Sequence, residues 1–247
     1  MTADPPAQPE ASRARPIRRI VRALISPNSF GSVLVLILIT YLLSVSLSQE
    51  WQRSVVLFVQ VATVWLALRV SGARRGVRLL ASVVLVLAIV IGVLNLTGVR
   101  GTSITAIIFL TSSVLYLIAP MSILRAIVLK REVDQETVLG AIDAYLLLGM
   151  FFAFVYQALG ALQPPFFEGG VHGTVAQSLF FSFTTLTTTG YGNLVPAANP
   201  GQSIAVMEML IGQLFLVTAV AKVINAWRPA RWAAVQNDEP STLDQPG

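Results

Sequence analysis

The sequence has no cysteine and only one histidine, His172. A chain without thiols can form neither a disulfide framework nor a thiolate metal site. It also offers no Ser/His/Asp triad, no glycine-rich nucleotide-binding loop and no paired carboxylates for acid–base chemistry. We therefore expect a protein that is not an enzyme and has no cofactor. His172 is expected to be a solvated loop residue rather than a ligand or a proton sensor.

Charged residues are also scarce: 12% of the 247 residues are Asp, Glu, Lys or Arg, whereas 55% are hydrophobic. The mean hydropathy of +0.72 is typical of a membrane protein and not of a soluble core. Six runs with little or no charge are long enough, or nearly so, to cross a bilayer. These runs are 30–49, 54–68, 79–99, 101–124, 144–167 and 203–221. We expect an all-α membrane protein with six transmembrane helices, of which the second is the weakest.

The few basic residues lie at alternate ends of these runs. All Lys and Arg residues except Arg53 and Arg100 precede the first run, follow the sixth, or lie between runs two and three or four and five. The positive-inside rule then places both termini in the cytoplasm and the segment between runs five and six outside, in the plasma membrane. Because the arginines form short loop clusters without interleaved aromatics, we expect no nucleic-acid partner.

The segment between the fifth and sixth runs contains a short apolar stretch. Thr174, followed three residues later by Gln177, is a capping box that predicts the start of a helix. The apolar residues 175–186 that follow are too few to span a bilayer, so we expect a short re-entrant helix. The polar residues 187–193 come next. Non-helical backbone at membrane depth is tolerated where it is buried in protein or lines a watery cavity, so this arrangement predicts a pore.

The motif Thr-x-Gly-Tyr-Gly at 188–192 resembles the selectivity filter of potassium channels. The wider stretch 144–225 resembles their two-helix pore module, in the order outer helix, pore helix, filter and inner helix. Glycine allows the alternating dihedrals by which a filter points successive carbonyl oxygens at one axis. The resemblance implies that backbone carbonyls bind K⁺ as the permeant ion, with no other metal. The expected ion-binding residues are Thr188, Thr189, Gly190, Tyr191 and Gly192.

This pore module departs from the family pattern at several positions. Thr189 stands where valine is usual, and Asn193, at the outer mouth, stands where aspartate is usual. Phe180 and Phe181 replace the pore-helix tryptophan that often bonds that aspartate, and Thr184 lies where some members have a buried acid. A weakly selective monovalent cation channel is therefore an alternative to a potassium-selective one.

The last run supplies the expected inner helix. Gly212 lies where the family often has a hinge glycine, although glycine is also common where membrane helices pack closely. Glu208 is expected to bond the pore helix or a neighbouring subunit, and Asp143, near the inner end of the fifth span, is expected to be a snorkelling cap. The residues expected to line the cavity and gate are Gly212, Gln213, Leu216, Val220 and Ile224.

The six-span layout resembles the voltage-gated architecture but departs from its sensor. Residues 104–119 carry no Lys or Arg, whereas each charge that moves across a membrane gains about 2.3 kcal/mol per 100 mV.

The expected domains are a cytoplasmic segment at 1–27, disordered and then interfacial, a four-helix transmembrane domain at 28–119, a cytoplasmic linker helix at 120–140, the pore domain at 141–228 and a disordered tail at 229–247.

One chain supplies one filter copy, so a ring of filters needs four chains. We expect a homotetramer in the lipid bilayer that conducts K⁺ passively and has no conventional voltage sensor. A potassium transporter subunit is a less favoured alternative, because such subunits carry four filter-like repeats and this chain has one. A non-conducting sensor or scaffold would have no use for the pair Gly190 and Gly192.

Overall fold

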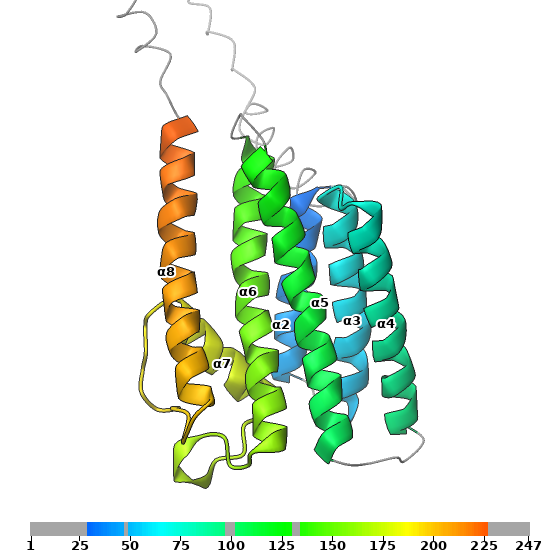
Figure 1. Ribbon diagram of the computed structural model, residues 1–247, viewed down its shortest axis with the longest axis vertical. Coiled ribbons are helices and arrows are strands. Elements are labelled where there is room, and N and C mark those ends of the chain that lie inside the picture. The colour runs from blue at the N-terminus through cyan, green and yellow to red at the C-terminus, as the bar shows by residue number, and fades with distance from the viewer. Residues whose placement is uncertain (1–28, 47–48, 97–101, 130–133, 227–247) are drawn as a thin grey trace, which may run out of the picture.

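Helices make up nearly all of the computed structural model, which describes residues 29–46, 49–96, 102–129 and 134–226 (Figure 1). The all-α prediction is confirmed for these residues. The elements are α2 (Phe30–Ser46), α3 (Gln49–Val70), α4 (Arg75–Leu96), α5 (Thr102–Leu129), α6 (Gln135–Leu162), the short 3₁₀ helix η2 (Glu168–Gly170), α7 (Val175–Leu186) and α8 (Gly201–Ala226).

Three of the described helices have both the length and the apolar composition to cross a membrane. They are Thr105–Leu129, Gln135–Leu162 and Gly201–Lys222, and they overlap the fourth, fifth and sixth predicted runs with shifted bounds. Apolar helices at Phe30–Ser46 and Val59–Val70 are shorter. A membrane protein is thus supported, while six complete spans stay a prediction.

The structure corrects the predicted linker helix at 120–140. The expected four-helix domain ends at 119, but α5 continues through Pro120 to Leu129, and α6 already begins at Gln135. Membrane helices tolerate proline where packing and local adjustments compensate for the lost hydrogen bond, and Pro120 is buried against its neighbours. In the described part of this stretch there is therefore no separate linker helix, only the adjoining ends of α5 and α6.

The first turn of α6 is capped by its preceding residue. The Asp134 carboxylate accepts hydrogen bonds from the Thr137 backbone N–H at 2.8 Å and from the Thr137 hydroxyl at 2.6 Å. Such a cap satisfies donors that the first helical turn leaves unpaired. From this start α6 runs antiparallel to α5, and the two share the most extensive helix contact of the described chain (Figure 1).

The contacts among α2, α3 and α5 include buried uncharged polar groups. Gln60 of α3 donates from Nε2 to the Ser112 carbonyl of α5 at 3.1 Å, and the hydroxyls of Thr40 and Thr63 lie 3.5 Å apart. Interhelical bonds of this kind hold membrane helices together where no hydrophobic force between them exists. These contacts join the first helices to α5 without ion pairs.

The short helix α7 lies between α6 and α8, toward one end of the bundle (Figure 1). An aromatic cluster holds it there, in which Phe181 of α7 packs edge-on against Tyr156 of α6 and Phe167 of the preceding loop, with ring centroids 4.9 and 5.5 Å apart. The opposite end of the bundle gathers the α3–α4 corner and the ends of α5 and α8. The two ends of the molecule are therefore chemically different, since Arg69, Arg74 and Lys222 belong to the second.

Candidate functional site

The start of α7 has the predicted capping box. The Gln177 backbone N–H donates to Thr174 Oγ1 at 3.2 Å, and the Thr174 N–H donates to Gln177 Oε1 at 2.9 Å. The helix spans Val175–Leu186, the bounds expected from the apolar run. Its 12 residues rise about 18 Å at 1.5 Å per residue, well short of a bilayer's apolar thickness of about 30 Å.

Beyond α7 the backbone adopts positive φ at every second residue. The φ angles are +57° at Thr188, +54° at Gly190 and +78° at Gly192. Glycine takes such angles without cost, but Thr188 is β-branched, and in the described chain it is the one non-glycine residue with positive φ. Strain of this kind persists where the surrounding structure imposes it, and it clusters at functional sites.

The end of α7 holds the N–H groups of this loop. Thr189 and Gly190 both donate to the Thr184 carbonyl, at 2.8 and 3.1 Å, and Thr188 donates to the Thr185 carbonyl at 2.9 Å. Within the described residues, no hydrogen bond reaches the carbonyl oxygens of 188–192. The loop therefore points its donors back at α7 and leaves a row of backbone acceptors unused.

Side chains on either side of the loop contact the predicted filter residues. Gln213 of α8 donates from Nε2 to the Thr188 hydroxyl at 3.0 Å, and so joins a predicted cavity residue to the inner end of the predicted filter. The Tyr191 ring stacks on Phe180 of α7, with centroids 5.8 Å apart and planes at 14°. Phe180 thus braces the loop by ring contact, where the family pattern uses a tryptophan hydrogen bond. Asn193 follows as an exposed residue.

The remaining predicted cavity residues lie along α8. Leu216 and Val220 are each about half exposed. Ile224 lies in α8 as well, but its side chain is outside the described set. Gly212 packs tightly, because a Cβ added there would be 2.5 Å from the Leu186 carbonyl oxygen and 2.8 Å from Leu186 Cδ1. This contact favours the close-packing interpretation of Gly212 over the hinge.

Glu208 of α8 links the three helices of the predicted pore module. Its side chain is wholly buried, and its carboxylate accepts hydrogen bonds from the Tyr156 hydroxyl of α6 at 2.6 Å and from the Ser182 hydroxyl of α7 at 2.5 Å. Bonding of Glu208 to the pore helix, one of the two expected roles, is confirmed. A buried carboxylate is tolerated where hydrogen bonds compensate for lost hydration.

The expected snorkelling role of Asp143 is wrong. Its side chain is wholly buried in α6, and within the described residues neither carboxylate oxygen has a hydrogen-bond partner. A snorkelling residue near a helix end extends to the interface, and the packing of α2 and α5 around α6 prevents this.

Two bracing side chains of α6 were missed from the sequence. Gln157 donates from Nε2 to the Gly173 carbonyl at 3.0 Å and to Ser178 Oγ at 2.6 Å, so it holds the start of α7. Tyr145 donates to the Leu186 carbonyl at 3.1 Å and holds its end. The available signal was that Gln157 interrupts an apolar run, since a polar group at membrane depth usually has a partner.

Comparison with known proteins agrees with this geometry. Residues 141–228 match a family model described as an ion channel. The chain is 29% identical over 97 residues to the voltage-gated potassium channel regulatory subunit KCNF1 of Rattus norvegicus, and 32% identical over 79 residues to the inward rectifier potassium channel Kirbac3.1 of Paramagnetospirillum magnetotacticum. It is 33% identical over 73 residues to a putative potassium channel protein of Rhodopseudomonas palustris.

These similarities support a potassium channel. The matches cover 39%, 32% and 30% of this chain and 18%, 25% and 16% of the three relatives, in the same order, so the chain spans a minor part of each relative's length. No solved structure matches the chain. The ion-channel match coincides with the range expected for the pore domain and agrees with the expectation that the protein is not an enzyme.

Proposed function

We propose that the chain is one subunit of a homotetrameric, potassium-selective channel through which K⁺ passes passively. The observation that carries this proposal is the loop at 188–192, where φ is positive at alternate residues and the backbone carbonyls accept no hydrogen bond from the described residues. Carbonyl oxygens in such a row replace the hydration shell of an ion when four copies surround one axis. The residues that bind K⁺ in the proposal are Thr188, Thr189, Gly190, Tyr191 and Gly192.

Assembly of four chains is supported by the surface of α8. Within a single chain, only 17% of the most apolar 18-residue stretch of α8 is buried, whereas 56% of the corresponding stretch of α6 is buried. The exposed apolar side chains of α8 include Leu210, Leu214 and Val217. A large apolar surface of this kind needs lipid or other copies of the chain to cover it. In a fourfold ring the inner helices would line the cavity below the filter, with Gln213, Leu216 and Val220 among the lining residues.

The proposed orientation has both termini in the cytoplasm and the filter loop toward the outside of the plasma membrane. The described basic side chains support it, because Arg69, Arg74, Arg78 and Lys222 belong to the end of the bundle opposite the loop that precedes α7 (Figure 1). Lys222 of α8 also donates to the Ile127 carbonyl near the end of α5 at 2.5 Å.

A flux experiment tests the function. Purified full-length protein in liposomes should carry K⁺ at a rate that exceeds Na⁺ flux at least tenfold. Equal K⁺ and Na⁺ flux would contradict potassium selectivity but leave a pore, and no flux of either ion from correctly assembled tetramers would contradict the channel.

A weakly selective cation channel is the second candidate. The observation that favours it is the 2.9 Å contact between the hydroxyls of Thr187 and Thr189, because position 189, where the family pattern has valine, makes a polar contact here. Reversal potentials measured with K⁺ and Na⁺ on opposite sides of the membrane distinguish the two candidates. A reversal potential close to the K⁺ equilibrium potential supports selectivity for K⁺. A reversal potential near zero supports the second candidate.

A further inference from the structure

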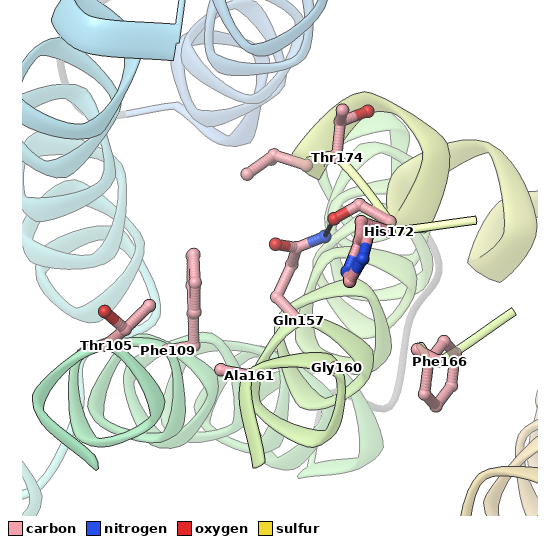
Figure 2. A pocket seen from close by; sticks show the side chains of 10 residues that line it. Thr105, Phe109, Gln157, Gly160, Ala161, Phe166, His172 and Thr174 are labelled. Carbon is pink, nitrogen blue, oxygen red and sulfur yellow. Dashed lines mark hydrogen bonds between the residues drawn. The ribbon is translucent and has the colours of Figure 1, made fainter. Parts of the chain in front are cut away.

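A cavity of about 240 Å³ lies outside the proposed ion path, between α5, α6 and the start of α7 (Figure 2). Thr105 and Phe109 of α5 form one wall, and Gln157 and Ala161 of α6 form another. The loop before α7 and its first residues complete the lining through Phe166, His172, Thr174 and Val175. A 150 Å³ cavity accommodates benzene, so this space accommodates a somewhat larger molecule.

The polar group that decides the chemistry of this cavity is the side-chain oxygen of Gln157. The residue is 8% exposed, and its Nε2 donates to the Gly173 carbonyl, which can only accept. The amide nitrogen is thereby required on that side, so Oε1 faces the opposite way, and in Figure 2 it points away from His172 toward the space beside Phe109. Within the described chain no hydrogen bond reaches Oε1. Oε1 is open to the cavity and receives no hydrogen bond from the described residues, so a ligand that supplies a donor can bond it.

The rest of the lining restricts the charge of that ligand. None of the lining residues is Asp, Glu, Lys or Arg. The capping box at the start of α7 occupies the N–H groups of Thr174 and Gln177. The rest of the lining is mixed: Phe109, Ala161, Phe166 and Val175 supply apolar surface beside the uncharged polar groups of Thr105 and Thr174 and the ring of His172.

We propose that this cavity binds a small uncharged molecule with one hydroxyl donor and an apolar body. The hydroxyl donates to Gln157 Oε1, and the body lies between Phe109 and Ala161. Gln157 also holds Gly173 and Ser178 at the start of α7, so occupancy of the cavity bears on the position of the helix that precedes the filter. The donor can come from a free alcohol or from the glycerol headgroup of an uncharged lipid.

Binding of benzyl alcohol to the full-length protein in nanodiscs tests the proposal, with toluene as the probe that lacks the hydroxyl. Saturation-transfer NMR should show saturable binding of benzyl alcohol, at least tenfold tighter than that of toluene. The readout requires no ion flux, so it succeeds or fails independently of the proposed function. Equal affinities for the two probes would overturn the role of Gln157 Oε1.

Variants locate the binding. Ala161→Phe should fill the cavity and abolish saturable binding, whereas Leu162→Phe, at the exposed neighbouring position, should leave it unchanged. Gln157→Leu should lower the affinity for benzyl alcohol to that for toluene, and it should leave the affinity for toluene unchanged. Should Ala161→Phe fail to assemble, Val175→Phe fills the same space from α7. Binding that survives the filling variant would place the site elsewhere and overturn the proposal.

A pair of lipids distinguishes the two sources of the hydroxyl donor, a free alcohol and a lipid headgroup. Monoolein presents glycerol hydroxyls, and methyl oleate has the same acyl chain without them. The site is assigned to a lipid headgroup if the wild type retains monoolein in preference to methyl oleate and Ala161→Phe loses this preference. Saturable benzyl alcohol binding without that retention assigns it to a free alcohol. Absence of both overturns the proposal.

Discussion

The carboxylate of Glu208 on α8 accepts a hydrogen bond of 2.5 Å from the Ser182 hydroxyl on α7. Both side chains are fully buried, and the Tyr156 hydroxyl of α6 bonds the other carboxylate oxygen. The contact ties the short helix that leads into the filter loop to both long helices that flank it. The position of α7 therefore depends on side chains of α6 and α8.

Removal of this contact is expected to destabilise the protein. Glu208→Leu should lower the free energy of unfolding by about 1 to 3 kcal/mol, because it leaves the buried Tyr156 hydroxyl without its acceptor, while the Ser182 hydroxyl keeps the Gly149 carbonyl. Ser182→Ala should cost less, since Glu208 keeps Tyr156. A double-mutant cycle of Ser182→Ala and Glu208→Gln, followed by thermal unfolding of the assembled protein, should give a coupling energy of about 0.5 to 3 kcal/mol. Strict additivity would contradict the importance of the contact.

Replacement of Gly190 by alanine should abolish K⁺ flux or its selectivity over Na⁺. At φ +54° the added Cβ meets no neighbouring atom, so the effect comes from backbone strain alone. Gly72 is a matched control, because it also has positive φ and open space but lies in the α3–α4 corner. Gly72→Ala should leave selectivity unchanged in liposome flux assays. Unaltered selectivity in Gly190→Ala would refute the filter assignment.

The variant Gly212→Ala distinguishes the two interpretations of Gly212, a site of close packing or a hinge. The new Cβ would collide with the Leu186 carbonyl oxygen, and we expect a loss of about 1 to 3 kcal/mol in the free energy of unfolding. Gly76→Ala, in open space on another helix, should be neutral or slightly stabilising. A Gly212→Ala protein with wild-type unfolding but altered open probability would support the hinge instead.

Conductance should depend only weakly on voltage. Residues 104–119 contain no Lys or Arg, and the one basic residue of α5, Arg125, lies beyond Pro120 near the end of the helix, so α5 carries no row of gating charges. Macroscopic currents recorded over a range of membrane potentials provide the measurement. A steep activation curve that requires several elementary charges per channel would show that the prediction is wrong.

Asn193→Asp should raise inward K⁺ conductance at low ionic strength. Asn193 is exposed, so four aspartates in a ring would place negative charge at the outer mouth and concentrate cations. At 1 M salt the Debye length is about 3 Å, and the gain should nearly vanish. Single-channel recordings at both salt concentrations test this. An equal gain at both would exclude the electrostatic explanation.

Local signals allowed much of the pore module to be predicted. Thr174 and Gln177 form a capping box through contacts within four residues, and the apolar run after them sets the length of α7. The boundary expected at 119 was wrong because α5 continues through the buried Pro120, and burial is set by tertiary packing that sequence-local rules do not contain. Asp143 misled it for the same reason, since burial depends on which helices surround α6.

The sequence by itself determined the membrane character of the chain, the bounds of α7 and the glycines at 190 and 192, because hydropathy, capping and backbone freedom act over a few residues. Only the tertiary structure decided that Glu208 bonds Ser182, that Gly212 packs against Leu186, and that Gln157 points its side-chain oxygen into the cavity. Each of these contacts joins residues at least 16 positions apart, and the choice of partner depends on how the helices pack.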